Sequence, residues 1–285
     1  MARNQQSIFG QESSSLGIGG GTGGGRGHTR ADVDAMQQGQ LLYRLTGESD
    51  FRDADVFYVT SFTTLNDSGV TGVAIIGYDV DSGTITVAIS ASGLEPNQVH
   101  IQHIHGFPDG TNATTPTTAL DDDGDGFVEL AEGLATYGPI LLDLSINHED
   151  GTGNDNGHSH EGGLSGFPTA PDGNIWFVET YQLPAGSLPA EPTLDLREIV
   201  IHGMSVDATD GVGTTGEVDG TAGFKLVLPV ASGELVEVAS ANELRYFIRD
   251  NDFDDAAAAN VDGPFGGSMA RFDAASAMGG VDLFG

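Results

Sequence analysis

Short runs of β-branched and aromatic residues recur through the middle of the chain, and this pattern limits the fold more than any other sequence feature. Residues 70–80 and 83–94 flank Asp81-Ser82-Gly83, which is typical of a hairpin turn. Within 83–94, isoleucine and valine alternate with threonine and alanine, so one face of the strand is apolar. Strands are also predicted at 56–65, 99–105, 138–144, 174–183, 194–203 and 222–231. Regular short strands with glycine-rich turns predict a mainly β protein with an antiparallel Greek-key β-sandwich or barrel.

The two ends of the chain differ from this central part. Residues 1–45 form a glycine-rich N-terminal arm that includes GIGGGTGGGRG. Residues 46–235 are predicted to form the sandwich, and residues 236–285 a C-terminal helix and a small-residue-rich tail. Ser240 and Glu243 match a capping box for that helix, and its apolar stripe consists of Leu244, Phe247 and Ile248. We expect the two arms to be available for self-association.

The charge balance narrows the range of partners. The chain has 42 acidic and 10 basic residues, a net charge of -32, and Lys225 is its only lysine. Such a charge repels nucleic acids and anionic membranes and favours divalent metal ions, although a saline habitat also selects acidic surfaces. No apolar run is long enough to span a membrane.

The absence of cysteine excludes disulfides and thiolate metal sites. The first residues lack an apolar stretch of signal-peptide length. We therefore expect an extracellular or cell-surface protein that is exported without a classical N-terminal signal peptide. The alternative is a cytoplasmic protein.

Residues 121–132, DDDGDGFVELAE, match the twelve-residue calcium loop of EF-hand proteins. Acidic side chains occupy positions one, three, five and twelve, and position seven contributes its backbone carbonyl. The glycine at position six permits the sharp turn that places these oxygens around the ion. Because TNATTPTTAL does not resemble an entering helix, we expect an isolated, structural loop between strands rather than a paired sensor. The predicted calcium ligands are Asp121, Asp123, Asp125, Phe127 and Glu132.

The eight histidines predict a second, transition-metal site. In HIQHIHGF, His103 and His105 are two residues apart and so share one face of a strand, and His202 ends another apolar strand. The segment HEDGTGNDNGHSH adds three imidazoles, and imidazole nitrogen suits copper and zinc. The competing interpretation is that these side chains are structural or solvated. The candidate ligands are His103, His105, His148, His158, His160 and His202, whereas His28 and His100 are treated as bystanders.

Four segments, taken in their order along the chain, resemble copper/zinc superoxide dismutases, and the first equally resembles the CHRD (chordin) domain. SGLEPNQVHIQHIHGFPDG is similar to the dismutase strand that carries two copper ligands, and LREIVIHG to the strand that carries the last one. HEGGLSGFPTAPDG resembles the zinc loop. GTAGFKLVLPV resembles the later strand whose arginine guides superoxide, a position that is Lys225 here. The resemblance covers residues 55–232 and implies a sandwich of superoxide dismutase type.

The chain also departs from that family. The dismutase disulfide cannot form, and the zinc-binding aspartate position falls on Gly163, for which Asp155 or Glu161 are substitutes. The calcium loop lengthens the spacing between His105 and His148, and YGPILLDL is more similar to CHRD domains. The fold is therefore a firmer inference than the activity.

Three functions follow from these residues. The first is a secreted, metal-binding structural or assembly protein that holds calcium together with copper or zinc. The second is a copper-dependent superoxide dismutase, in which the resemblance gives copper to His103, His105, His148 and His202, zinc to His148, His158 and His160, and substrate attraction to Lys225. The third is a metal-scavenging module without catalysis. The enzyme alternative is the one that a superoxide assay tests.

Overall fold

The computed structural model describes residues 51–146, 164–183, 193–238 and Leu244. Within these residues the chain forms two five-stranded sheets, and every pair of neighbouring strands is antiparallel. Sheet A runs in the order β10 (Val236–Val238), β1 (Val56–Ser61), β3 (Thr71–Asp79), β4 (Thr84–Ser92), β7 (Asn174–Gln182). Sheet B runs in the order β2 (Thr63–Thr64), β9 (Gly223–Glu234), β8 (Glu198–Val206), β5 (Gln102–His105), β6 (Ile140–Asp143).

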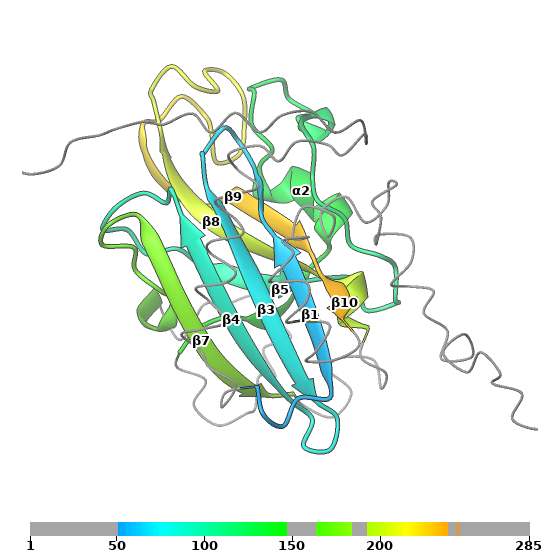
Figure 1. Ribbon diagram of the computed structural model, residues 1–285. Coiled ribbons are helices and arrows are strands. Elements are labelled where there is room, and N and C mark those ends of the chain that lie inside the picture. The colour runs from blue at the N-terminus through cyan, green and yellow to red at the C-terminus, as the bar shows by residue number, and fades with distance from the viewer. Residues whose placement is uncertain (1–50, 147–163, 184–192, 239–243, 245–285) are drawn as a thin grey trace, which may run out of the picture.

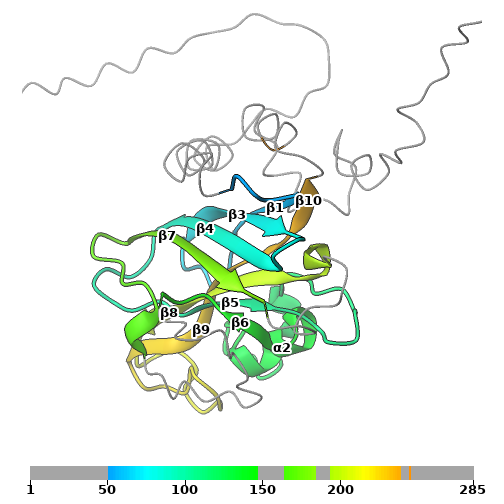
Figure 2. The same ribbon diagram turned by 90° about the horizontal axis from the view of Figure 1, so that it is seen from below.

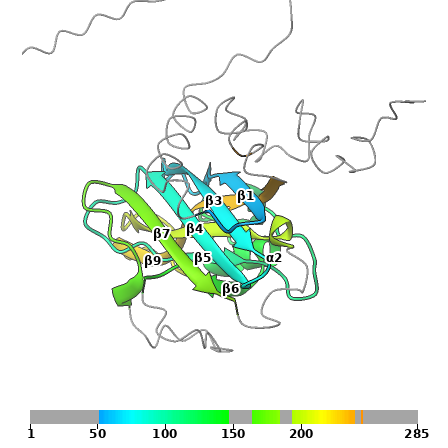
Figure 3. The ribbon, with the colours of Figure 1, turned by 60° about the horizontal axis from the view of Figure 1, so that its bottom comes forward.

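The sheets lie face to face, with sheet A in front of sheet B in the view of Figure 1. The order β7, β4, β3, β1 across sheet A is easily followed in Figure 3. The chain leaves sheet A after β4, forms β5 and β6 in sheet B, and returns as β7 beside β4. The predicted mainly β, antiparallel sandwich is therefore confirmed.

The strand boundaries differ from the predicted ones where the chain changes sheets. The predicted strand 56–65 is divided between β1 and β2, because Phe62 turns into the core and the chain crosses to sheet B there. The predicted strand 194–203 begins only at Glu198, since a 3-10 turn, η3 (Leu194–Leu196), precedes it. Strand β10 was not predicted, and it follows β9 after a single residue.

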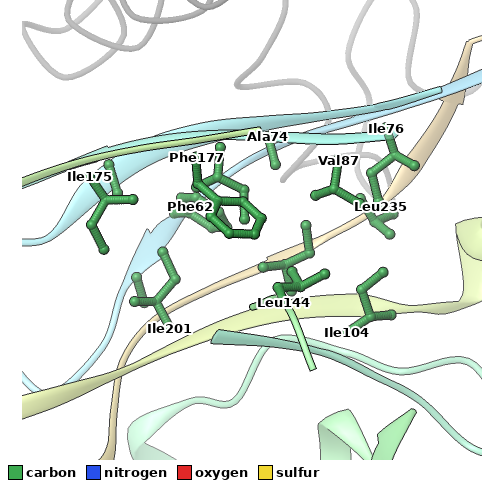
Figure 4. Close-up of a cluster of buried hydrophobic side chains, with 14 of the residues drawn as sticks. Phe62, Ala74, Ile76, Val87, Ile104, Leu144, Ile175, Phe177, Ile201 and Leu235 are labelled. Atoms are coloured by element: carbon green, nitrogen blue, oxygen red, sulfur yellow. The ribbon is translucent and has the colours of Figure 1, made fainter. Parts of the chain in front are cut away.

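The main core lies between the two sheets and consists of their inward-facing side chains. Ile76 and Val87 of sheet A point toward Ile104 and Ile201 of sheet B (Figure 4). The predicted alternation in β4 holds, because Ile85, Val87 and Ile89 all belong to this core. Each such buried side chain contributes about 1.5–3 kcal/mol relative to an exposed one.

One α-helix, α2 (Leu130–Tyr137), lies on the sheet B side of the sandwich (Figure 2). It was not predicted. A reciprocal capping box joins Glu129 and Glu132 at its start, and Gly138 ends it with a φ of 78°. The helix predicted after residue 233 lies outside the described residues except for Leu244. In the described parts of the chain, no helix is long and apolar enough to cross a membrane.

Candidate metal centres

Three histidines lie together on the face of sheet B that points away from sheet A. His103 and His105 are alternate residues of β5, and His202 lies on the neighbouring strand β8. Ile104 and Ile201 belong to the core between the sheets, so the three histidines project from the opposite face. Each histidine is 1% exposed, and one nitrogen of each lies within 4.8 Å of the other two. The structure thus brings together the three strand histidines that the sequence singled out.

Backbone carbonyls fix two of the three rings in one tautomer. The Nδ1 of His105 lies 2.8 Å from the carbonyl oxygen of Gly138, and the Nδ1 of His202 lies 2.7 Å from that of Val227. A carbonyl oxygen only accepts hydrogen bonds, so in both rings the hydrogen sits on Nδ1 and the lone pair on Nε2. Such a second contact is typical of histidines that bind metals.

The His105 ring is neutral over a wide pH range. Burial lowers its pKa to about 4, against the smaller opposing effect of the hydrogen bond to Gly138. Its Nε2 is buried and has no hydrogen-bond partner among the described residues. A buried polar atom without a partner is costly, and a metal ion would satisfy it. This atom is the observation that fits a metal best.

His103 is oriented by a neighbouring carboxylate. Its Nε2 lies 3.3 Å from Oδ1 of Asp143, which is the residue opposite it on β6. The negative charge of this carboxylate favours a hydrogen on Nε2 of His103, which would leave the lone pair on Nδ1. Asp143 was missed by the sequence analysis, since nothing in the sequence reveals which residue of 138–144 pairs with His103.

The other predicted transition-metal ligands, His148, His158 and His160, lie in residues 147–163, outside the described part of the chain. The described residues on either side of that segment meet, because the backbone N–H of Ile146 donates to the carbonyl of Gly166 at 2.8 Å. Phe167 then packs against His103, with ring centroids 5.5 Å apart. The three loop histidines therefore stay predicted ligands, and Phe167, a few residues after that segment, lies beside the cluster.

His100 is buried close to the cluster but belongs to a different environment. Its two ring nitrogens lie 3.0 Å from the carbonyl oxygens of His202 and Glu95. Both nitrogens are thus engaged with backbone, as expected of a bystander. His28 lies outside the described residues.

Lys225, the residue proposed to guide superoxide, is held by its own surroundings. Its ammonium donates to the Thr221 hydroxyl at 2.8 Å and lies 3.5 Å from Asp219 Oδ1. This carboxylate offsets the positive charge of Lys225 locally.

The calcium loop lies between β5 and β6 and gathers its carboxylates in two overlapping groups. Oxygens of Asp121, Asp123 and Glu132 lie within 4.8 Å of one another, as do oxygens of Asp123, Asp125 and Glu129. All four predicted side-chain ligands therefore lie close together. A three-residue 3-10 turn, η1 (Thr118–Leu120), takes the place of an entering helix.

The loop backbone is folded around Asp121. Its carboxylate accepts hydrogen bonds from Gly124 N–H at 2.8 Å and Gly126 N–H at 3.0 Å. Gly126 has a φ of 94°, a left-handed conformation that favours glycine. Phe127 N–H donates to Asp125 Oδ1 at 2.7 Å, and its carbonyl stays a predicted calcium ligand.

Asp125 shows the electrostatic cost of this arrangement. Burial raises its pKa, and the charges of Asp123, Asp121 and Glu132 add to that effect. Its Oδ2 is buried and has no hydrogen-bond partner among the described residues. A bound cation would relieve both the repulsion and the missing contact.

Glu129 is a buried carboxylate that the sequence analysis missed. It is 4% exposed, it accepts a hydrogen bond from Val218 N–H at 2.6 Å, and burial raises its pKa to about 7. Glu129 is position nine of the loop, where EF-hand loops often bind calcium through water, so the loop pattern was a signal that could have found it. Residues of the loop 207–222 also contact this side of the calcium loop, since Thr215 N–H donates to Asp123 at 3.3 Å and Glu217 accepts from Leu130 N–H at 3.2 Å.

Asn66 fastens the calcium loop to the sandwich. Its side-chain oxygen accepts from Val128 N–H at 2.7 Å, and its amide donates to the carbonyls of Val128 at 3.0 Å and Pro229 at 2.9 Å. Val128 itself is 2% exposed. The apolar position eight of the loop is therefore anchored on both its backbone groups.

No protein-family model matches the chain, and no curated protein matches it either. The chemistry of the two centres therefore carries the functional argument.

Proposed function

We propose that the protein is a metal-binding β-sandwich with a structural or assembly role outside the cell. In this proposal His103, His105 and His202 hold copper or zinc, and the loop 121–132 holds calcium. The observation that carries it is the buried trio of imidazoles, in which His105 Nε2 has no other partner in the described part of the chain.

The donor set supports a borderline transition metal. Neutral imidazole nitrogens suit copper and zinc better than calcium or magnesium. Three buried nitrogens are also the usual protein share of an open zinc site, with Zn–N distances of about 2.0–2.1 Å. The metal would supply a fixed cross-link between β5 and β8, and the predicted loop histidines would complete its coordination. A sandwich of the superoxide dismutase or CHRD type is consistent with this arrangement.

The calcium half of the proposal rests on hard-ligand chemistry. Carboxylate oxygens at positions one, three, five and twelve are what calcium requires. The exit helix α2 begins at Leu130, the tenth position, so the twelfth residue, Glu132, lies in its first turn. An extracellular location fits a loop of this kind, because calcium is more abundant there and no disulfide is available to stabilise the fold.

Elemental analysis of the full chain, purified without chelators, tests both halves together. We expect one transition-metal ion and one calcium ion per chain. His105→Gln should lose the transition metal and keep calcium, whereas Asp125→Asn should lose calcium and keep the transition metal. His28→Gln, a histidine change in the N-terminal arm, should lose neither. A transition-metal content that is identical in the His105→Gln and His28→Gln variants would falsify the histidine site.

A superoxide assay distinguishes the dismutase alternative from this proposal. Asp219 pairs with Lys225, and all three strand histidines are buried, so we expect no substrate-guiding role for Lys225. A copper-loaded protein should consume superoxide no faster than the same concentration of free copper. A faster rate that falls with Lys225→Glu would favour the enzyme.

Self-association through the terminal arms is part of the proposed assembly role. Its motivation is the length of small-residue-rich chain at both ends of one sandwich. Light scattering of the full chain against residues 46–250 tests it. Monomers in both samples at every concentration would remove this part of the proposal.

A further inference from the structure

One short helix joins the two metal centres. Glu132, the last calcium ligand, lies in the first turn of α2. Its carboxylate accepts hydrogen bonds from Asp122 N–H at 2.7 Å and from Glu129 N–H at 2.9 Å. The calcium loop and the start of the helix therefore share one side chain, so neither can move without the other.

The other end of α2 contacts the histidine cluster. The Tyr137 ring packs against His105 with centroids 4.6 Å apart, and the next carbonyl, that of Gly138, accepts the hydrogen bond from His105 Nδ1 at 2.8 Å. That hydrogen bond places the ring hydrogen on Nδ1. The lone pair is therefore on Nε2, the nitrogen available to a metal in the cluster. Glu132 and Gly138 are six residues apart, about 9 Å along a helix.

The helix end is held firmly enough to transmit a shift. Tyr137 is fully buried, and its hydroxyl donates to the Leu130 carbonyl at 3.0 Å. Gly138 N–H continues the helical pattern to the Leu134 carbonyl at 3.0 Å. A displacement at the start of α2 therefore reaches the Gly138 carbonyl within two helical turns.

We propose that calcium in the loop 121–132 controls the affinity of the histidine cluster for its transition metal, through α2. This inference rests on the proposed function of both centres. Without a cation, the crowded carboxylates repel one another and loosen the first turn of α2, so the Gly138 carbonyl no longer holds His105 in its metal-binding orientation. With calcium bound, the helix and the ring are fixed before the second metal arrives.

The sign of the effect distinguishes this coupling from simple electrostatics. Two cations at neighbouring centres repel each other, so charge alone predicts that calcium weakens transition-metal binding. A structural coupling predicts the opposite. Coupling between sites in proteins typically changes affinity five- to 150-fold, and we expect a gain of about tenfold here.

A cobalt titration of the full-length, metal-stripped protein tests the proposal. Co²⁺ bound by imidazoles absorbs visible light, whereas Ca²⁺ is silent, so cobalt affinity can be measured with and without millimolar calcium. The His105→Ala variant gives the baseline for cobalt held elsewhere. Asp125→Asn should abolish the calcium effect, and Asp81→Asn, which removes an equal charge from the β3–β4 turn, should preserve it.

Variants of Tyr137, at the C-terminal end of α2, test whether the coupling passes through this helix. Tyr137→Leu removes the ring that packs on His105, so it should keep calcium affinity and lose the calcium dependence of cobalt binding. Tyr137→Phe keeps the ring on His105 and loses only the hydrogen bond to the Leu130 carbonyl, so it should keep the larger part of that dependence. If Tyr137→Leu does not fold, the Asp125→Asn comparison still decides.

Each outcome has a definite meaning. Tighter cobalt binding with calcium in the wild type, absent in Asp125→Asn, supports the coupling. Cobalt affinity that is equal or weaker with calcium overturns the coupling and leaves the proposed centres standing. No imidazole-bound cobalt under either condition overturns the histidine centre itself.

Discussion

At the scale of single residues, the role of a histidine is decided by which of its nitrogens the backbone uses. His100 and His105 are both buried on or next to β5. Carbonyl oxygens face both nitrogens of His100, whereas in His105 only Nδ1 faces one. His105 therefore has one nitrogen available for a ligand, whereas both nitrogens of His100 face backbone carbonyls.

Glu198 is a buried carboxylate whose effect on the stability of the fold depends on pH. It is fully buried, its Oε1 accepts a hydrogen bond from the Thr115 hydroxyl at 2.6 Å and another from Ser232, and its Oε2 has no hydrogen-bond partner among the described residues. Burial raises its pKa to about 7, and the charge of Glu234, its cross-strand neighbour, adds to this. The folded protein thus prefers the protonated acid.

The pH dependence of stability follows from that preference. Between the ordinary glutamate pKa and about 7, the folded state binds more protons than the unfolded state, so stability falls as pH rises through this window. The loss is on the order of 3 kcal/mol by pH 8. Glu198→Gln, which stays neutral, should raise the free energy of unfolding at pH 8 by about 2 kcal/mol and change it little at pH 4.

Denaturant unfolding at several pH values measures this effect. Glu179→Gln, a half-buried glutamate on the edge strand β7, is the matched control and should leave the slope with pH unchanged. A Glu198→Gln variant with the same pH slope as the wild type would contradict the assignment.

At the scale of elements, α2 depends on a glycine in its interior. Gly133 is buried, and a Cβ at this position would lie 2.4 Å from the Tyr137 ring. The ring cannot retreat, because it also packs on His105 and bonds to the Leu130 carbonyl. The glycine thus lets the aromatic side chain fold back over its own helix and reach the histidine cluster.

Gly133→Ala should therefore destabilise the protein, although alanine normally favours a helix by about 1 kcal/mol. We expect a loss of about 1–3 kcal/mol from overpacking, read from the denaturation midpoint. Ala135→Gly, at an exposed position of the same helix, should cost about 1 kcal/mol through propensity alone. If Gly133→Ala is as stable as the wild type, the ring is not fixed as described.

At the scale of the whole molecule, sheet A is apolar on both faces. Its outer face carries a second cluster that includes Phe57, Val59, Val73 and Ile75. Leu244, far along the chain, packs into this cluster and is fully buried. Leu244 therefore contributes to the stability of the sandwich.

Leu244→Ala should lower the free energy of unfolding by about 2–3 kcal/mol, as expected for a leucine removed from a core. Leu134→Ala is the matched control, because Leu134 is 45% exposed and should change stability by less than about 1 kcal/mol. Equal midpoints for the two variants would show that Leu244 is not part of the core.

The sequence by itself determined the β architecture, the calcium-loop pattern and the face shared by His103 and His105. These features are periodic or local, so alternation and fixed spacing are enough to reveal them. The loop pattern also places Glu129 at the ninth position, where EF-hand loops often bind calcium through water. The short helix α2 escaped prediction because its N-terminal cap is a glutamate rather than one of the preferred capping residues.

Only the tertiary structure decided which groups surround each centre. The pairing of His103 with Asp143 depends on the register of β5 against β6, and the approach of His202 depends on β8 lying beside β5. The contact between Tyr137 and His105 depends on where α2 packs on sheet B. These contacts join residues that lie far apart in the sequence. The relative positions of these residues depend on how the whole core packs. A local sequence pattern does not specify that packing.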